Sequence, residues 1–153
     1  MAGDVVLRPA APPDADDIAE IMQASRHSHA WMPMLHTPAE YRIFVREHVL
    51  ARHVAVATIA QTAIGFIARE GEWIEHLYIS PQWTGRGVGG RLLDHVAGGM
   101  PVARLYCFQA NDGARRFYEK RGFTAEAYGD GSANEEKLPD ILYVRRQSAA
   151  STA

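Results

Sequence analysis

The amino-acid sequence predicts a single α/β domain in which short strands alternate with amphipathic helices. Three observations support this fold class: β-forming residues fill most of residues 53–79, a glycine-rich segment over 84–90 leads from a strand into a helix, and a strand–helix–strand order runs over 73–108. The 153 residues, 47% of them hydrophobic, are enough for one hydrophobic core. We expect this domain to span residues 1–147 and residues 148–153 to form a disordered tail.

The N-terminal region predicts a short strand and two helices. Val5 and Leu7 lie in an extended segment, and the prolines of residues 12–14 favour the first turn of a helix. The apolar face of that helix repeats at i, i+3 and i+4, at Ile18, Ile21 and Met22. Thr37 and Glu40 have the spacing of a capping box, which predicts a second helix whose apolar face comprises Tyr41, Phe44, Val45 and Val49.

A three-strand meander is predicted next. Residues 53–60 and 63–69 are rich in β-forming residues, and the intervening Gln61 and Thr62 predict a hairpin turn. Gly71 then marks the turn into a third strand over residues 72–80.

The second half of the chain predicts a helix, a strand, a helix and a final strand. The first of these helices ends near Gly98, and its apolar face comprises Val88, Leu92, Leu93 and Val96. Residues 102–108 are predicted to form a buried strand, residues 112–121 a helix and residues 141–144 the last strand. The strand over residues 72–80 together with the helix, strand and helix that follow it is a βαβ unit with one helix added.

The glycine-rich segment has the composition of a phosphate site. Gly85, Gly87 and Gly89 carry no side chain that would block a ligand, and their backbone can adopt positive φ. Backbone N–H groups at the start of the following helix can then converge on one anion. We therefore predict a pyrophosphate-binding cradle over residues 84–90, although a plain tight turn would use the same glycines.

Gly85, Gly87 and Gly90 also satisfy the GxGxxG spacing of a dinucleotide-binding loop. In that fold the loop belongs to the first strand–helix turn of a larger sheet, whereas here a meander precedes it. Asp112 lies near the position of an acidic ribose ligand, but it also begins a predicted helix. A Walker A loop is excluded because no Gly-Lys-Ser/Thr follows.

Neighbouring segments extend the cradle into a larger pattern. The motif Gln-x-x-Gly-x-Gly occupies residues 82–87, Leu-Tyr-Ile-Ser-Pro precedes it over 77–81, and Asn111 and residues 117–123 follow it. Together they resemble the GCN5-related N-acetyltransferase (GNAT) family over residues 72–123. The resemblance implies a central mixed, mostly antiparallel sheet of about 6–7 strands with flanking helices, in which strands 4 and 5 splay apart to accept pantetheine.

The resemblance implies acetyl-CoA (coenzyme A) as the cofactor and no metal. The implied cofactor-binding residues are Leu77, Tyr78, Ile79, Gln82, Thr84, Gly85, Arg86, Gly87, Val88, Gly89, Gly90, Asn111, Ala114, Phe117 and Tyr118. Residues 77–79 would contribute mainly backbone contacts, as an added strand would. From the residues alone, the side chains at 77–79 are also typical of a core and Asn111 of a helix N-cap.

Tyr118 is the implied general acid. It matches the family's tyrosine near the cofactor sulfur, and a phenol that is protonated at neutral pH can donate to the departing thiolate. By helical spacing alone, Tyr118 would instead belong to a buried face with Ala114 and Phe117.

A base must take a proton from the acceptor, because an amine arrives mostly as ammonium. Glu75 matches a strand glutamate of many GNAT members and is the preferred base, directly or through water, with His76 as the alternative. An exposed strand charge is the plain interpretation of Glu75. The Leu77 backbone N–H is the expected donor to the oxyanion.

The resemblance also implies an acceptor, the primary amine of a small molecule or peptide. We expect its pocket in the loop over residues 26–37 and the hairpin near 128–138, with Trp31, Met34 and His76 as pocket residues. A metal site is disfavoured because no acidic or cysteine ligand accompanies the histidines of this loop at a convincing spacing. The identity of the amine stays open.

Composition disfavours several other classes. A net charge of -2 and a pI near 6.4 argue against a nucleic-acid partner. No apolar run approaches the ~20 residues of a membrane span and the N-terminus lacks a signal pattern, so we expect a soluble protein. One cysteine, expected to be a small buried residue, suits the cytoplasm. A homodimer is compatible with the resemblance, and a non-catalytic acyl-CoA sensor and a dinucleotide-dependent redox domain are the alternative functions.

Overall fold

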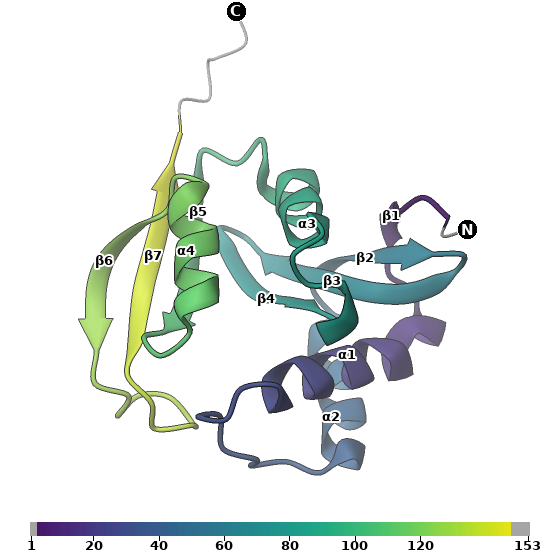
Figure 1. Cartoon of the computed structure of the whole chain (residues 1–153), viewed down its shortest axis with the longest axis horizontal. Coiled ribbons are helices and arrows are strands. Elements are labelled where there is room, and N and C mark those ends of the chain that lie inside the picture. Colours follow the sequence, from purple (N-terminus) through teal and green to yellow (C-terminus); the bar gives the residue numbers. More distant parts are fainter. Residues whose placement is uncertain (1–2, 148–153) are drawn as a thin grey trace, which may run out of the picture. The chain divides into compact units, whose positions relative to one another are not determined.

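The computed structural model describes residues 3–147, and the expected tail at 148–153 lies outside them. In chain order the elements are β1 (Val6–Pro9), η1 (Pro12–Asp14), α1 (Ala15–His27), α2 (Pro38–Phe44), η2 (Val45–Val49), β2 (His53–Ile59), β3 (Thr62–Glu70), β4 (Trp73–Ile79), η3 (Pro81–Trp83), α3 (Val88–Ala97), β5 (Val102–Phe108), α4 (Asp112–Lys120), β6 (Thr124–Gly129) and β7 (Asp140–Arg146) (Figure 1). No helix within this range has both the length and the apolar composition needed to cross a membrane.

In the described part of the chain, seven strands form a mixed sheet in the order β1-β2-β3-β4-β5-β7-β6. β1 with β2, β2 with β3, β5 with β7 and β6 with β7 pair antiparallel. β4 and β5 pair in parallel, with Trp73 opposite Arg104. The predicted mixed, mostly antiparallel sheet with flanking helices is confirmed.

The chain folds into two compact units. The first comprises the chain up to Glu70 together with Glu75–Gly98, and the second comprises Gly71–Ile74 and the chain from Gly99 onward. β4 therefore belongs to both, because its first residues lie in the second unit and the rest in the first. The single domain expected over residues 1–147 stays a prediction.

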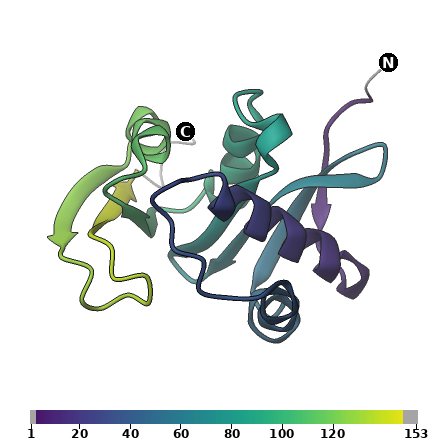
Figure 2. The same cartoon turned by 60° about the horizontal axis from the view of Figure 1, so that its bottom comes forward.

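The first unit has helices on both sides of its strands. α1 and α2 lie on one side of β2 and β3, and α3 lies on the other (Figure 1, Figure 2). Phe66 of β3 is buried in the cluster that contains Ile18 and Met22 of α1 and Tyr41 of α2. Its neighbour Gly65 faces α3, since a Cβ there would lie 3.4 Å from Leu92 Cδ1. Because successive residues of β3 face opposite sides of the sheet, the strand packs against α1 and α2 with one face and against α3 with the other.

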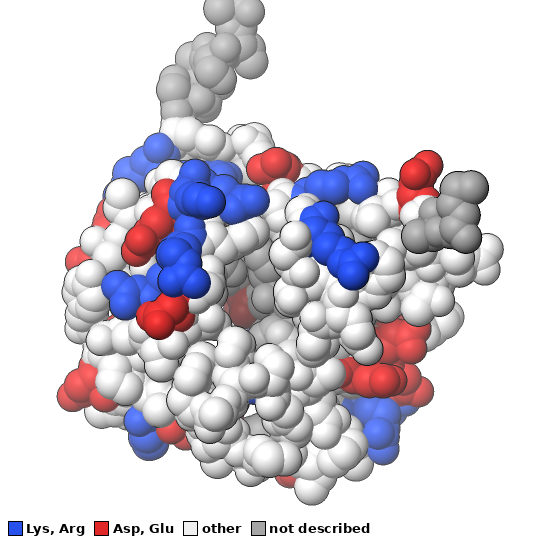
Figure 3. All heavy atoms as spheres, in the orientation of Figure 1, with Lys and Arg blue, Asp and Glu red and all other residues white. Residues whose placement is uncertain are grey.

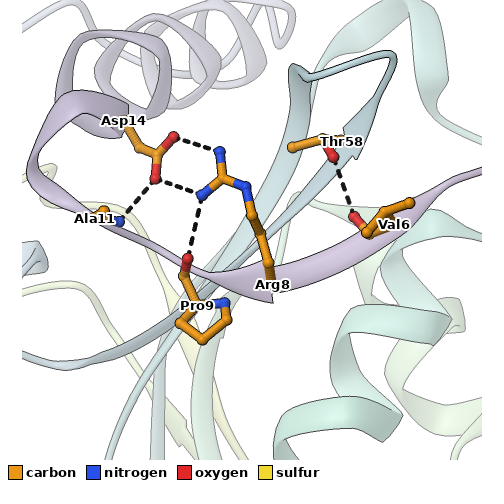
Figure 4. A network of polar contacts seen from close by, with 6 residues as sticks. All are labelled: Val6, Arg8, Pro9, Ala11, Asp14 and Thr58. Atoms are coloured by element: carbon orange, nitrogen blue, oxygen red, sulfur yellow. Dashed lines mark hydrogen bonds and ion pairs between the residues drawn. The ribbon is translucent and has the colours of Figure 1, made fainter.

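An ion pair joins β1 to the start of α1. The Asp14 carboxylate is buried and accepts from both terminal nitrogens of Arg8 at 2.8 Å and from the Ala11 backbone N–H at 2.7 Å (Figure 4). The hydrogen bond from Arg8 is the main reason that the pKa of Asp14 lies below its ordinary value. This contact fixes the turn through which the chain enters α1.

The second unit packs α4 on one face of β5, β7 and β6. Tyr118 of α4 lies against Tyr143 of β7, with ring centroids 6.3 Å apart, and against Phe123, at 5.5 Å. On β5, buried Leu105 and Cys107 alternate with Tyr106, which is 63% exposed and stacks on Trp73. The strand predicted as buried is thus buried on one face.

Two details of the first unit differ from the expectation. The β2–β3 turn consists of Ala60 and Gln61, with φ of 49° and 69°, so it lies one residue earlier than predicted. Phe44, expected in the core, is 38% exposed. The cause is the π-helical turn η2, which follows Phe44 and whose wider spacing rotates the buried face onto Val45 and Val49.

β6 is a strand that the sequence pattern does not predict. Its residues are mostly exposed, it lies at one edge of the sheet, and its register against β7 shifts between Ala125 and Ala127. An exposed edge strand with a register shift has no alternation of apolar and polar residues to reveal it.

Candidate active site

The predicted cradle, residues 84–90, lies in the first unit between β4 and α3. Gly85 and Gly87 have φ of 76° and 83°, in the left-handed region. A Cβ at either position would meet no atom within 4 Å. The backbone conformation, and not crowding, favours glycine here, and the space beside the loop is open to a ligand.

The first turn of α3 provides backbone donors to this space. The first hydrogen bond of the helix runs from the Arg91 N–H to the Gly87 carbonyl, at 3.2 Å. The N–H groups of Val88, Gly89 and Gly90 therefore precede the helical ladder. Together with the positive end of the helix dipole, they form an arrangement that suits a phosphate group.

The side chains of the cradle hold its shape. The Thr84 hydroxyl donates to the carbonyl three residues earlier at 3.1 Å, and the Ser80 hydroxyl donates to Gln82 Oε1 at 2.6 Å. The Arg86 guanidinium lies 4.9 Å from the centre of the Trp83 ring. Gln82 and Thr84 thus make contacts within the loop, and their predicted contacts with a cofactor, like that of Arg86, stay predictions.

β4 carries half-buried side chains from Leu77 to Ile79. The Tyr78 hydroxyl accepts from an Arg26 guanidinium nitrogen at 3.2 Å, and its ring lies 5.9 Å from that of Phe66. A Cβ on Gly65 would lie 3.2 Å from the Tyr78 carbonyl oxygen, so β3 and β4 approach closely. These contacts agree with the core interpretation of the side chains, and the backbone role in cofactor binding stays a prediction.

The two candidate bases have different surroundings. Glu75 Oε1 accepts from Arg52 Nε at 2.6 Å. The His76 ring lies 5.7 Å from Phe44 and 6.3 Å from Tyr78. Burial lowers the pKa of His76 to about 4, so this imidazole is neutral at physiological pH. Glu75 is thus an ion-paired carboxylate, whereas His76 is an uncharged group among aromatic rings.

The expected acceptor loop exposes apolar side chains. Trp31 stacks on His29 at 4.7 Å, and Met34 is 72% exposed. Met32 is buried, and its sulfur accepts from Arg26 at 3.3 Å. Within residues 3–147, no three His, Cys, Asp or Glu side chains are arranged to hold a metal ion. Trp31 and Met34 keep their predicted place in the acceptor pocket as an expectation.

In the second unit, Asn111 caps α4. Its Oδ1 accepts from the Ala114 backbone N–H at 3.1 Å, which confirms the N-cap interpretation. The side-chain amide nitrogen takes no part in this bond and is the group that could contact a cofactor.

Tyr118 is 9% exposed, and its ring packs on Phe117 at 5.1 Å as well as on Phe123 and Tyr143. The buried helix face expected from the spacing is therefore present, with Ala114 and Phe117 half-buried beside it. The role of the hydroxyl as an acid stays a prediction.

Cys107 is a buried free thiol on β5. Burial raises its pKa to about 11, so it is protonated at neutral pH. This agrees with the expected packing role.

Two polar residues near the candidate site were not indicated by the sequence. Arg52 binds Glu75, and the buried Tyr143 hydroxyl donates to Glu119 Oε2 at 2.6 Å. Their partners lie 23 and 24 residues away along the chain. No local spacing rule covers such pairs, so a three-dimensional structure is needed to find them.

The mixed sheet with flanking helices is that of an α/β protein, and the loop before α3 has the geometry that a phosphate site requires. Residues 39–125 match the family model described as an acetyltransferase (GNAT) domain, which is more than half of the chain. The chain belongs to the GNAT family.

Individual relatives agree with this assignment. An uncharacterized N-acetyltransferase of Archaeoglobus fulgidus is 30% identical in an alignment of 96 residues. The match covers 52% of this chain and 65% of that protein, slightly less than two thirds of its length. A GCN5-related N-acetyltransferase from Rhodopseudomonas palustris shares the fold, with a TM-score of 0.78 and 24% identity, over 96% of this chain and 98% of that one. PaiA N-acetyltransferase from Thermoplasma acidophilum, solved in complex with coenzyme A, has a TM-score of 0.70 and 19% identity over 94% and 99%.

Proposed function

We propose that the chain is an N-acetyltransferase that moves the acetyl group of acetyl-CoA to a primary amine of a small molecule or peptide, by direct attack in a ternary complex. The observation that carries the proposal is the cradle. Two left-handed glycines open a space beside three helix-start N–H groups, and a side chain at either glycine would enter that space. Family membership and the coenzyme A bound to the Thermoplasma acidophilum relative support the same ligand.

Several residues of the chain would each have a distinct role in acetyl transfer. Acetyl-CoA, when bound, supplies an activated acetyl thioester. The N–H groups of Val88, Gly89 and Gly90 would hold its pyrophosphate, and the β4 backbone over residues 77–79 would pair with its amide-bearing arm. The Leu77 N–H would donate to the thioester oxygen, and the Tyr118 hydroxyl would give its proton to the sulfur.

Glu75 is the proposed base, acting directly or through a water molecule. Its carboxylate accepts a hydrogen bond from Arg52 through Oε1, and a carboxylate can take up a proton from an ammonium group. His76 is the alternative base, since burial lowers its pKa to about 4 and keeps the imidazole neutral. The preference for Glu75 predicts that Glu75→Gln reduces turnover much more than His76→Gln. Equal losses would contradict this assignment.

The acceptor is proposed to carry an apolar group. Four of the exposed large hydrophobic side chains lie close together in sequence, at Met34, Leu35, Ile43 and Phe44. Exposed apolar side chains in the region expected to bind the acceptor favour an aromatic or aliphatic amine over a polyamine. A panel of phenylethylamine, phenylalanine amide, spermidine and a free-amine peptide would rank these classes by kcat/KM.

Two assays test the proposed function. Calorimetry should show saturable binding of acetyl-CoA and none of NAD(P), and thiol release should rise with at least one amine of the panel. Binding of NAD(P) without acetyl-CoA would support the dinucleotide-dependent redox domain instead. Tight acetyl-CoA binding without thiol release from any amine would support the acyl-CoA sensor.

The proposed location is the cytoplasm, and the proposed assembly is a homodimer. One buried cysteine suits the reducing cytoplasm. A homodimer follows from the family resemblance, and sedimentation velocity distinguishes it from a monomer.

A further inference from the structure

Arg52 lies between two carboxylates of the first unit. It follows η2 and precedes β2, and its Nε lies 2.6 Å from Glu75 Oε1 and 2.9 Å from Glu70 Oε2. The side chains of Arg52 and Glu75 are 30% and 33% exposed. Charge-assisted bonds of this length are the stronger kind, and partial burial reduces screening by salt. The guanidinium is therefore placed to fix the Glu75 carboxylate.

This contact uses one oxygen of Glu75. The hydrogen bond and the ion pair from Arg52 both end on Oε1 and do not involve Oε2. An ionised carboxylate can accept several hydrogen bonds, so the Arg52 contact leaves Oε2 able to accept a proton or to bind a water.

We propose that Arg52 is a positioning residue for Glu75: it holds the ionised carboxylate by Oε1 and leaves Oε2 to remove the proton from the acceptor. The inference rests on the proposed function, in which Glu75 is the base. In the step, one N–H bond of the ammonium breaks, the electron pair stays on nitrogen, and an O–H bond forms at Oε2, directly or through one water. Arg52 keeps its own protons throughout.

Glu70 increases the importance of the guanidinium. Both carboxylates share Arg52 Nε, so without Arg52 two negative charges would face each other, and like charges favour the protonated form. His76 on β4 is a further titratable neighbour. Burial lowers its pKa to about 4 and keeps it uncharged at neutral pH, while Glu75 favours its protonation and Arg26 and Arg52 disfavour it. Loss of Arg52 should therefore leave the Glu70 and Glu75 carboxylates to repel each other and displace Glu75.

Carboxyl ¹³C NMR at pH 7 tests the contact without any acceptor, with Glu75→Gln assigning the resonance. We expect Arg52→Gln to shift the Glu75 carboxyl resonance, because it removes the hydrogen bond to Oε1. Arg52→Lys keeps the charge and should shift the resonance less. An unmoved resonance in Arg52→Gln overturns the proposal. If Arg52→Gln does not fold, Arg52→Lys alone should shift the resonance, and no change there overturns it.

Steady-state kinetics connect the contact to the chemistry. They are measured with acetyl-CoA and the two panel amines that release thiol fastest. In Arg52→Gln, kcat should fall about tenfold with both amines, while KM for the amine and the affinity for acetyl-CoA are retained. Arg52→Lys, which keeps the charge, should recover part of the loss. An unchanged kcat in Arg52→Gln, or a Glu75→Gln variant with the wild-type rate, overturns the proposal. If the proposed function fails, wild-type protein releases no thiol while the NMR shift persists, and the catalytic role of Arg52 falls with it.

Discussion

At the scale of single residues, Asp14 shows how a buried charge can be satisfied. Its carboxylate receives three hydrogen bonds, from Arg8 and from the Ala11 N–H, and so joins the end of β1 to the first turn before α1. Removing one partner of such a group leaves the other without compensation.

Asp14→Asn should lower the free energy of unfolding at pH 7 by about 2 kcal/mol, reduced from the fully buried case because Arg8 is partly exposed. The folded pKa of Asp14 lies below its ordinary 3.8, so this contribution is complete above that pH and is lost as the pH falls through the folded value. Urea unfolding of both proteins from pH 7 to pH 2 measures the difference, which should shrink below about pH 4. A difference that stayed constant across this range would contradict the assignment.

Tyr118→Phe should lower kcat about 100-fold and leave acetyl-CoA affinity nearly unchanged, because it removes a proton donor and keeps the packed ring. Stopped thiol-release assays and calorimetry measure the two quantities. Tyr143→Phe is the matched control. It deletes the hydroxyl that donates to Glu119, so it should reduce stability but not kcat. A full rate in Tyr118→Phe would exclude the acid role.

At the scale of elements, the predicted cradle requires a left-handed backbone conformation at Gly85 and Gly87. Gly87→Ala should weaken acetyl-CoA binding at least about tenfold, because it strains a residue with φ of 83° and places a methyl group in the open space before α3. Gly71→Ala imposes similar strain at φ 58°, also with no atom within 4 Å of the new Cβ. Calorimetry should show weakened binding in the first variant alone. Equal affinities would remove the cradle as the ligand site.

The β2–β3 hairpin contains strain that can be relieved. Ala60 and Gln61 both adopt left-handed φ in a two-residue turn, the conformation for which Asn-Gly is preferred. Replacing the pair by Asn-Gly should stabilise the protein by about 1 kcal/mol, measured by urea unfolding. Ala60→Val should destabilise it, because a branched side chain tolerates this conformation poorly. A destabilised Asn-Gly variant would show that the turn takes another form.

At the scale of the whole molecule, charge is mixed. The net charge is -2, and on the face drawn in Figure 3 basic side chains lie beside acidic ones amid a mostly uncharged surface. Such a surface lacks the charge needed for counterion-driven binding. We therefore expect the protein to elute from heparin without retention at physiological salt. Retention that falls steeply with added salt would contradict this.

The parts of the structure that sequence could predict are those decided by neighbouring residues. The capping box of Thr37 and Glu40 and the N-cap at Asn111 are confirmed, since each depends on groups three residues apart. The glycine-rich segment leads into a helix as predicted because its glycines are needed where they stand.

Features that depend on distant parts of the chain escaped prediction. β6 has no alternating pattern, and its pairing with β7 defines it. The contact of Arg52 with Glu75 joins the segment before β2 to β4, and no local spacing rule relates these two positions. The turn at Ala60 was displaced because alanine gives no sign of a left-handed backbone.

The protonated state of Cys107 has a consequence for the order of events. With a pKa of about 11, this thiol is protonated at pH 7, so the chain's single cysteine is a poor nucleophile for taking an acetyl group from the donor. Under the proposed function, both molecules must then occupy the protein at the same moment. The rate of such an enzyme is limited by whichever of its two substrates is further from saturation, and excess donor without acceptor gives no turnover.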